Sequence, residues 1–342
     1  MGKPTVLFTA VASGLHLRRA EKVSSRAFRT LKEQDIELRG SPRPLMSPEE
    51  LREALEAQAD LKVVFVASGG TSRILSKALG GLEVLLWAHP SDNSLPSALS
   101  AREKMRSSGS WRGEIVFSSP DTVPRELLAE IRVLGALGDL SRTRVLAFCS
   151  EGKAKEIRGA PAQVLGPWSP RLEHIELDLL VEAAREGRRI GSMGEALSVL
   201  PGLSCEEPTP ELEEGFMKNV EMALYIEDEL SGGDEAVVVT FDCFDLLDRL
   251  GMTPCVAMGL LLEHGITAVC EADPGALVLM AIFHLLTDRA PWMANLTGFD
   301  PTSGTILLAH CTACPSLAPT WPYRGHFLEH FESGRPVSLD IW

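Results

Sequence analysis

The chain has 342 residues, of which 45% are hydrophobic and 23% are charged. This composition is typical of a globular protein and excludes a largely disordered chain. The formal net charge of −14 argues against nucleic acid as a partner, because phosphate binding needs concentrated Lys and Arg. No uncharged apolar stretch reaches the length of a membrane span, and the N-terminus shows no signal-peptide pattern. We therefore expect a cytoplasmic protein with no membrane partner.

Two further compositional features bear on the environment of the protein. Asn and Gln occur only three times each, and a depletion of these heat-labile amides is one mark of a thermophile. The seven Cys lie mostly in apolar stretches, which favours buried thiols in a reducing compartment over disulfide bonds.

The first 140 residues alternate short apolar runs with longer amphipathic ones. They predict strands at 6–11, 61–67, 82–88 and 114–117, and helices at 16–34, 72–79, 95–106 and 124–137. Strands separated by stretches of helical period indicate βαβ units and a parallel sheet.

A second series of the same kind begins with a predicted strand at 144–148. A long acidic helix is predicted at 210–230, and the small-residue turn Ser231-Gly-Gly-Asp234 ends it. After the turn we predict strands at 236–241 and 267–270 and helices at 254–263 and 275–286. The remainder, from residue 290, is predicted as strands and proline-rich loops. The fold class is therefore α/β, with two α/β domains and a β-rich C-terminal segment.

Two polar features follow predicted strands, at the edge where open α/β sheets bind ligands. Ser68-Gly69-Gly70-Thr71 could bind an anion through its backbone N–H groups. It lacks the spacing of a dinucleotide or Walker motif, so a plain tight turn explains it better on this evidence alone. Asp242 follows the strand at 236–241, and helix capping explains it about as well as function does.

Two carboxylates stand where the apolar strand at 267–270 ends. Asp273 precedes Pro274-Gly275 and is well placed to cap the next helix. Glu271 follows Val269-Cys270 and has little structural reason to be there. His310 follows another apolar stretch and opens a Cys311-x-x-Cys314 pair. A carboxylate at one strand end and an imidazole at another would suit a divalent metal.

Five segments, taken in order and spacing, resemble one protein family. They are Asp242-Cys-Phe, Thr253-Pro-Cys-Val-Ala-Met, Gly265-Ile-Thr-Ala-Val-Cys-Glu-Ala-Asp273, Leu286-Thr287-Asp288-Arg289-Ala290-Pro291 and His310-Cys-Thr-Ala-Cys-Pro. Through these segments the chain resembles the L-fucose/L-arabinose isomerase family, with good coverage from about 235 to 333. The first 230 residues match mainly as stacked α/β domains.

The resemblance implies two Rossmann-like, doubly wound domains at 1–140 and 141–288, and a C-terminal β segment at 289–342 that is shorter than the family's. It also implies a homo-oligomer, trimeric or hexameric, that acts on a small sugar. The chemistry would be aldose–ketose isomerisation by proton transfer through an enediol, assisted by a divalent metal, commonly Mn²⁺.

Residue roles follow by matching positions to the family. Glu271 would be a metal ligand and the base, and His310 would be a metal ligand. Asn295 stands where the family has a second acid and would be a weakened metal ligand at the catalytic site. The positions expected to bind or orient substrate are Gly69, Gly70, Thr71, Asp242 and Asp273. A last histidine of the family lies beyond the end of this sequence.

Two alternatives remain open at this point. An asparagine can coordinate a metal but carries no charge and cannot accept the proton. Asn295 therefore favours a non-catalytic protein that binds a sugar or a partner chain on an isomerase fold. The second alternative is a zinc or thiol protein built on Cys311 and Cys314, although no second CxxC pair completes a zinc site.

Overall fold

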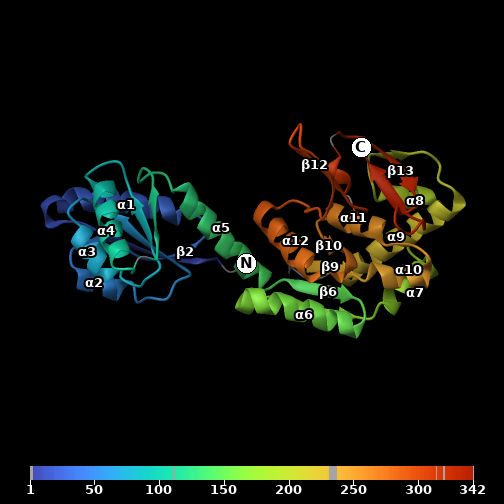
Figure 1. Cartoon of the computed structure of the whole chain (residues 1–342), viewed down its shortest axis with the longest axis horizontal. Helices are drawn as coiled ribbons and strands as arrows, with labels where there is room; N and C mark the ends of the chain where they lie inside the picture. The colour runs from blue at the N-terminus through green and yellow to red at the C-terminus, as the bar shows by residue number, and fades with distance from the viewer. Residues whose placement is uncertain (1–2, 111, 231–236, 313, 319, 342) are drawn as a thin grey trace. The chain divides into compact units, whose positions relative to one another are not determined.

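A computed structural model describes residues 3–110, 112–230, 237–312, 314–318 and 320–341 (Figure 1). The predicted turn at Ser231–Asp234 lies outside these residues. The chain divides into two compact units, Met1–Gly138 and Asp139–Trp342. Both units are α/β, and each is built around a parallel sheet of Rossmann type. In the described part of the chain, no helix combines the length and the apolar character needed to cross a membrane.

The first unit contains a five-stranded sheet in the order β2-β1-β3-β4-β5, and every neighbouring pair is parallel. Its strands are β1 (Thr5–Val11), β2 (Glu37–Leu45), β3 (Leu61–Val66), β4 (Leu85–Ala88) and β5 (Glu114–Phe117). The helices are α1 (Leu17–Lys32), α2 (Pro48–Ala54), α3 (Ser72–Ala78), α4 (Ser94–Ser107) and α5 (Arg125–Leu140). This strand order is that of flavodoxin-like doubly wound sheets.

Helices cover both faces of the first sheet, because its strands bury alternate residues on opposite sides. Val6, Phe8 and Ala10 of β1 join one apolar cluster with residues of α1 and α5. Leu7 and Val11 of the same strand join a second cluster with residues of α2, α3 and α4.

The second unit has a four-stranded parallel sheet in the order β10-β9-β6-β7. Its strands are β6 (Arg144–Phe148), β7 (Arg171–Ile175), β9 (Val237–Phe241) and β10 (Thr267–Val269). Taken in chain order these are its first to fourth strands, and their arrangement 2-1-3-4 repeats that of the first four strands of the other unit.

The helices of the second unit surround this sheet (Figure 1). They are α6 (Glu151–Leu165), α7 (Asp178–Glu186), α8 (Met193–Ser198), α9 (Pro210–Leu230), α10 (Cys243–Leu250), α11 (Cys255–Glu263) and α12 (Pro274–Thr287). Helix α12 packs against α6, while α9 packs against both α7 and α11. The predicted acidic helix and the observed α9 have the same bounds.

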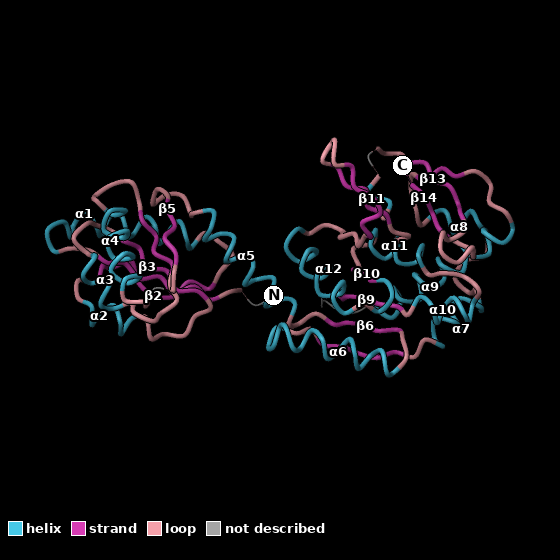
Figure 2. Tube along the Cα trace, viewed as in Figure 1, coloured by secondary structure: helices cyan, strands magenta, loops and turns pink. Residues whose placement is uncertain are grey.

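The C-terminal residues are β-rich, as predicted, and form two small sheets. β11 (Asn295–Asp300) and β12 (Thr305–Ala309) make an antiparallel hairpin that projects from the second unit (Figure 2). β13 (Tyr323–Leu328) pairs with β14 (Ser338–Ile341) and, in parallel, with β8 (Leu203–Cys205). Val337 and Phe327 are buried in the apolar core of the same unit. The end of the chain is therefore part of the second unit's packing.

Candidate metal centre

A pocket of about 250 Å³ lies in the second unit beyond the carboxyl ends of β9 and β10. It is here called the Glu271 pocket. Glu271, Asn295 and His310 all line it, together with Cys243, Cys255, Cys270, Cys311 and His330. The structure thus brings together the three residues that the sequence proposes as metal ligands. This is the sheet edge where open α/β folds bind ligands.

Glu271 lies in the short 3-10 turn η3 (Cys270–Ala272) between β10 and α12. Its φ is +60°, and that of Ala272 is +52°. Left-handed backbone is costly for residues with a Cβ and gathers at functional sites. The N–H of Glu271 donates to Sγ of Cys243, at 3.3 Å, which anchors the turn to the start of α10. The Glu271 side chain is exposed.

The β11–β12 hairpin brings Asn295 and His310 to the same end of one ribbon. Asn295, the first residue of β11, pairs with Ala309, the last residue of β12, and His310 follows directly. The Nδ1 atom of His310 lies 3.0 Å from Oγ1 of Thr312. This contact orients the imidazole ring, as polar neighbours of metal-binding histidines commonly do.

Four cysteines gather at the Glu271 pocket, and the sequence did not single out three of them. We call Cys243, Cys255, Cys270 and Cys311 the thiol cluster. The Sγ atoms of Cys243 and Cys270 are 3.1 Å apart. Among the described residues, two sets of potential metal ligands have all their ligand atoms within 4.8 Å of one another: Cys255 with Cys311 and His330, and Cys270 with His310 and Cys311.

The thiol cluster shifts the ionisation of its own members. The pKa of the Cys311 thiol is held well below its usual value, because the Cys255 and Cys270 thiols hydrogen-bond to it and His310 lies beside it. The pKa of Cys255 is raised by its hydrogen bond to Cys311 and by burial. The pKa of Cys270 is raised by its hydrogen bonds to Cys243 and Cys311. These contacts therefore favour the thiolate form of Cys311.

Cys314 does not join its sequence neighbour Cys311. Its Sγ lies 3.0 Å from Oε2 of Glu263 and 2.8 Å from Oγ of Ser316. Burial raises the pKa of the Cys314 thiol to about 11. Cys311 and Cys314 thus have different neighbours, and neither set of potential metal ligands found among the described residues contains Cys314, so the structure gives the pair no support as a two-thiol site.

Asp242 and Asp273 cap helices. Asp242 accepts a hydrogen bond from the N–H of Asp245 at the start of α10, at 3.3 Å. Asp273 accepts one from the N–H of Ala276 at the start of α12, at 2.8 Å. Neither residue is among those that line the Glu271 pocket. Their side chains stabilise the two helix starts that border it.

The Gly69-Gly70-Thr71 turn belongs to the first unit, where it follows β3. The N–H of Ser13, after β1, donates to Oγ of Ser68, at 2.9 Å, so the turn lies at the point where the strand order reverses. A Cβ on Gly69 would come within 2.7 Å of Cβ of Asn93, and Gly70 has a φ of +78°. Thr71 is fully buried and is hydrogen-bonded to the side chain of Ser97. Local packing thus accounts for all three positions.

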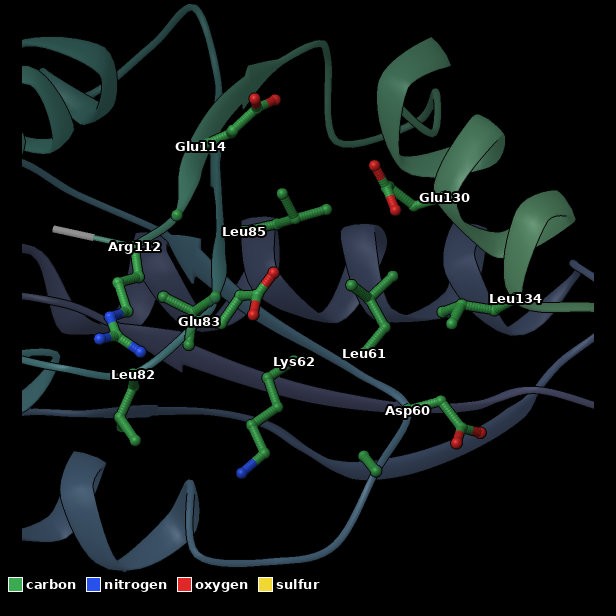
Figure 3. A pocket seen from close by; sticks show the side chains of 13 residues that line it. Asp60, Leu61, Lys62, Leu82, Glu83, Leu85, Arg112, Glu114, Glu130 and Leu134 are labelled. Carbon is green, nitrogen blue, oxygen red and sulfur yellow. The ribbon is translucent and has the colours of Figure 1, made fainter. Parts of the chain in front are cut away.

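A cavity of about 680 Å³ also lies in the first unit (Figure 3). Charged side chains of both signs line it: Lys62, Arg112, Asp60, Glu83, Glu114 and Glu130. It lies at the amino ends of β3, β4 and β5, since Leu61, Leu85 and Glu114 begin those strands. Ligands of open α/β sheets bind at the opposite edge, so its position favours the Glu271 pocket instead.

No family model matches the chain, and no curated protein matches it either.

Proposed function

We propose that the second unit carries a metal-dependent sugar isomerase site of the type that the resemblance implies. One observation supports this: Glu271, from η3, and Asn295 and His310, from the open end of the β11–β12 hairpin, line one pocket. The pocket volume of about 250 Å³ is close to the lower end of small-molecule sites, roughly 300–1,000 Å³. A small aldose is the proposed substrate.

The donors of the pocket fit a divalent metal such as Mn²⁺ by type, since they include a carboxylate, an amide oxygen and an imidazole. Such an ion would polarise the sugar oxygens. Glu271 would bind the ion and move the proton between C1 and C2. His310 would bind through the nitrogen that does not face Thr312. Asn295 would be a weaker ligand of the ion through its amide oxygen, without charge and without taking a proton.

The test is ketose formation from a panel of aldoses with Mn²⁺ added to chelator-treated protein. Glu271→Gln should abolish turnover, whereas Glu206→Gln, at an exposed position outside the pocket, should not. Asn295→Asp should raise turnover by restoring a charged ligand. Ketose formation that survives in Glu271→Gln would contradict the proposal.

Asn295 itself favours a second candidate, a non-catalytic protein that binds a sugar or a partner chain. Loss of a charged group from an otherwise assembled pocket would lower the rate of proton transfer more than it lowers the affinity for a sugar. This candidate predicts that sugars bind, by calorimetry, while no ketose forms with wild type or with Asn295→Asp.

The β11–β12 hairpin supports the homo-oligomer that the resemblance implies. Cross-strand partners share a face of a ribbon, and the pairs Phe299–Ile306 and Leu296–Leu308 give one apolar face. These four side chains are 64%, 58%, 65% and 42% exposed, and such patches mark interaction sites. We propose that this face, here called the hairpin face, contacts a second copy of the chain.

The seven cysteines form no disulfide bond, which supports a cytoplasmic location.

A further inference from the structure

The thiol cluster is assembled from segments far apart in the sequence. Cys255 is the first residue of α11, Cys270 begins η3, and Cys311 follows β12. His330, between β13 and β14, joins them. Four segments of the second unit thus place thiol and imidazole groups in the lining of the Glu271 pocket.

The spacing of these groups suits a metal ion with tetrahedral coordination. Zinc holds thiolates at about 2.3 Å, so two sulfur ligands of a tetrahedral site lie roughly 3.8 Å apart. The ligand atoms of Cys255, Cys311 and His330 are all within 4.8 Å of one another. The Sγ atom of Cys270 lies within 4.8 Å of the Sγ atom of Cys311, in a second set with His310, which places a further thiol next to the shared sulfur. Cys270 is not in the set that contains Cys255 and His330, so its side chain would have to move toward them to share one ion.

The imidazole of His330 is already held in place. His330 is only 6% exposed, and its Nδ1 lies 3.2 Å from Oγ of Ser333. Its backbone N–H donates to the carbonyl of Arg335, and its own carbonyl accepts from the N–H of Gly334, both at 2.8 Å. Since Nδ1 is engaged with Ser333, Nε2 is the nitrogen that would bind an ion. A fixed second partner of this kind is typical of metal-binding histidines.

Core packing alone accounts poorly for this arrangement. Buried free cysteines usually behave as small apolar residues among other apolar residues. Cys311, in contrast, is partly exposed, and its Sγ atom lies within 4.8 Å of a ring nitrogen of His310 and of His330.

We propose that Cys255, Cys311 and His330 bind one Zn²⁺, with Cys270 beside Cys311 as the fourth donor. Thiolates select zinc over manganese, and binding displaces the thiol protons. The ion would tie α11, η3, the end of the hairpin and the turn at 330 together around the pocket. This inference goes beyond the proposed function, because none of these four ligands is assigned a role in it.

The test is a titration of chelator-treated full-length protein with Zn²⁺, followed by elemental analysis after desalting. One equivalent should remain bound. Co²⁺ in its place should give an intense thiolate-to-cobalt charge-transfer band, which carboxylate and imidazole ligands alone would not produce. Cys255→Ser and Cys311→Ser should lose the bound equivalent, and His330→Gln should weaken binding by about tenfold or more.

Matched controls are Cys149→Ser and Cys314→Ser, which remove buried thiols outside the cluster and should keep the zinc. Circular dichroism of every variant checks that it is folded, and the Co²⁺ spectrum of wild type needs no variant. No bound zinc in wild type, or zinc retained in folded Cys311→Ser, would overturn the proposal. So would loss in Cys314→Ser together with retention in Cys255→Ser.

The outcome is separable from that of the isomerase proposal. Glu271→Gln should keep the zinc equivalent even if ketose formation disappears. Zinc binding without any ketose formation would contradict only the isomerase proposal. Ketose formation without zinc binding would contradict only the zinc proposal.

Discussion

The side chain of Asn219 accepts a hydrogen bond from the backbone N–H of Ala257, at 2.8 Å. Asn219 is fully buried on α9, and its Nδ2 donates to the carbonyls of Thr253 and Gly215, at 3.0 and 2.9 Å. One amide thus fixes the start of α11, where Cys255 lies.

Asn219→Ala should lower the free energy of unfolding by about 2–3 kcal/mol, because it leaves buried backbone groups unpaired. Urea unfolding measures this. Gln163→Ala, at an exposed position of α6, should stay within about 0.5 kcal/mol of wild type. If the two variants change the free energy of unfolding equally, the Asn219 hydrogen bonds do not stabilise the start of α11.

The left-handed backbone at Glu271 predicts that glycine is more stabilising than alanine at this position, the reverse of their usual order. Glycine normally destabilises relative to alanine, but a φ of +60° is strained for any residue with a Cβ. Glu271→Gly should therefore be more stable than Glu271→Ala by about 1 kcal/mol. Urea unfolding of both variants gives the difference.

The control for this prediction is the same pair of substitutions at Glu182, an exposed position within α7. There Gly should be the less stable variant, by about 1 kcal/mol. If alanine is also the more stable residue at position 271, the left-handed turn is contradicted.

The contact between His264 and Glu227 makes stability depend on pH. Nδ1 of His264, at the end of α11, lies 2.5 Å from Oε1 of Glu227 on α9. This hydrogen bond to a carboxylate raises the pKa of His264 above its usual value. A raised pKa means that the stabilisation is complete below about pH 6.5, the unfolded value, and is lost as pH rises through the folded value.

His264→Gln should accordingly lower the free energy of unfolding by about 0.5–1 kcal/mol at pH 5.5, a modest amount because both groups are partly exposed. The loss should shrink toward zero at pH 9. Urea unfolding at the two pH values tests this. Glu227→Gln should show the same pH dependence, and the double variant should add nothing further. A loss that grows with pH would have the wrong sign.

The proposed contact through the hairpin face predicts which substitutions would dissociate an oligomer of the chain. Ile306→Glu places a charge on that face and should shift the protein toward monomer by light scattering coupled to size-exclusion chromatography. Leu307→Glu is the matched control, since Leu307 is 64% exposed on the same strand but its side chain points to the other side of the ribbon. An unchanged mass for Ile306→Glu would rule out this interface.

Much of the fold could be predicted from periodicity, because the central strands are apolar runs and the helices between them are amphipathic. β2 could not. Its sequence includes Pro42 and Pro44 and shows little apolar alternation, and it is an edge strand where proline is tolerated. The elements between 150 and 209 also went unpredicted.

The site was only partly accessible to sequence reasoning. Glu271 and His310 each stand at the end of an apolar run, and the resemblance added Asn295. The thiol cluster could not be predicted, because its cysteines are isolated in sequence and meet only through tertiary packing. The visible pair, Cys311 and Cys314, was misleading because Glu263 and Ser316 hold Cys314 elsewhere.

The hairpin face also has a practical consequence for handling the protein. At neutral pH the net charge of −14 makes copies of the chain repel one another. Near the sequence pI of about 5.1 that repulsion disappears, whereas the apolar attraction between hairpin faces does not depend on the net charge. Colloidal stability should therefore be lowest in mildly acidic buffers, and purification or crystallisation trials near pH 5 should favour precipitation.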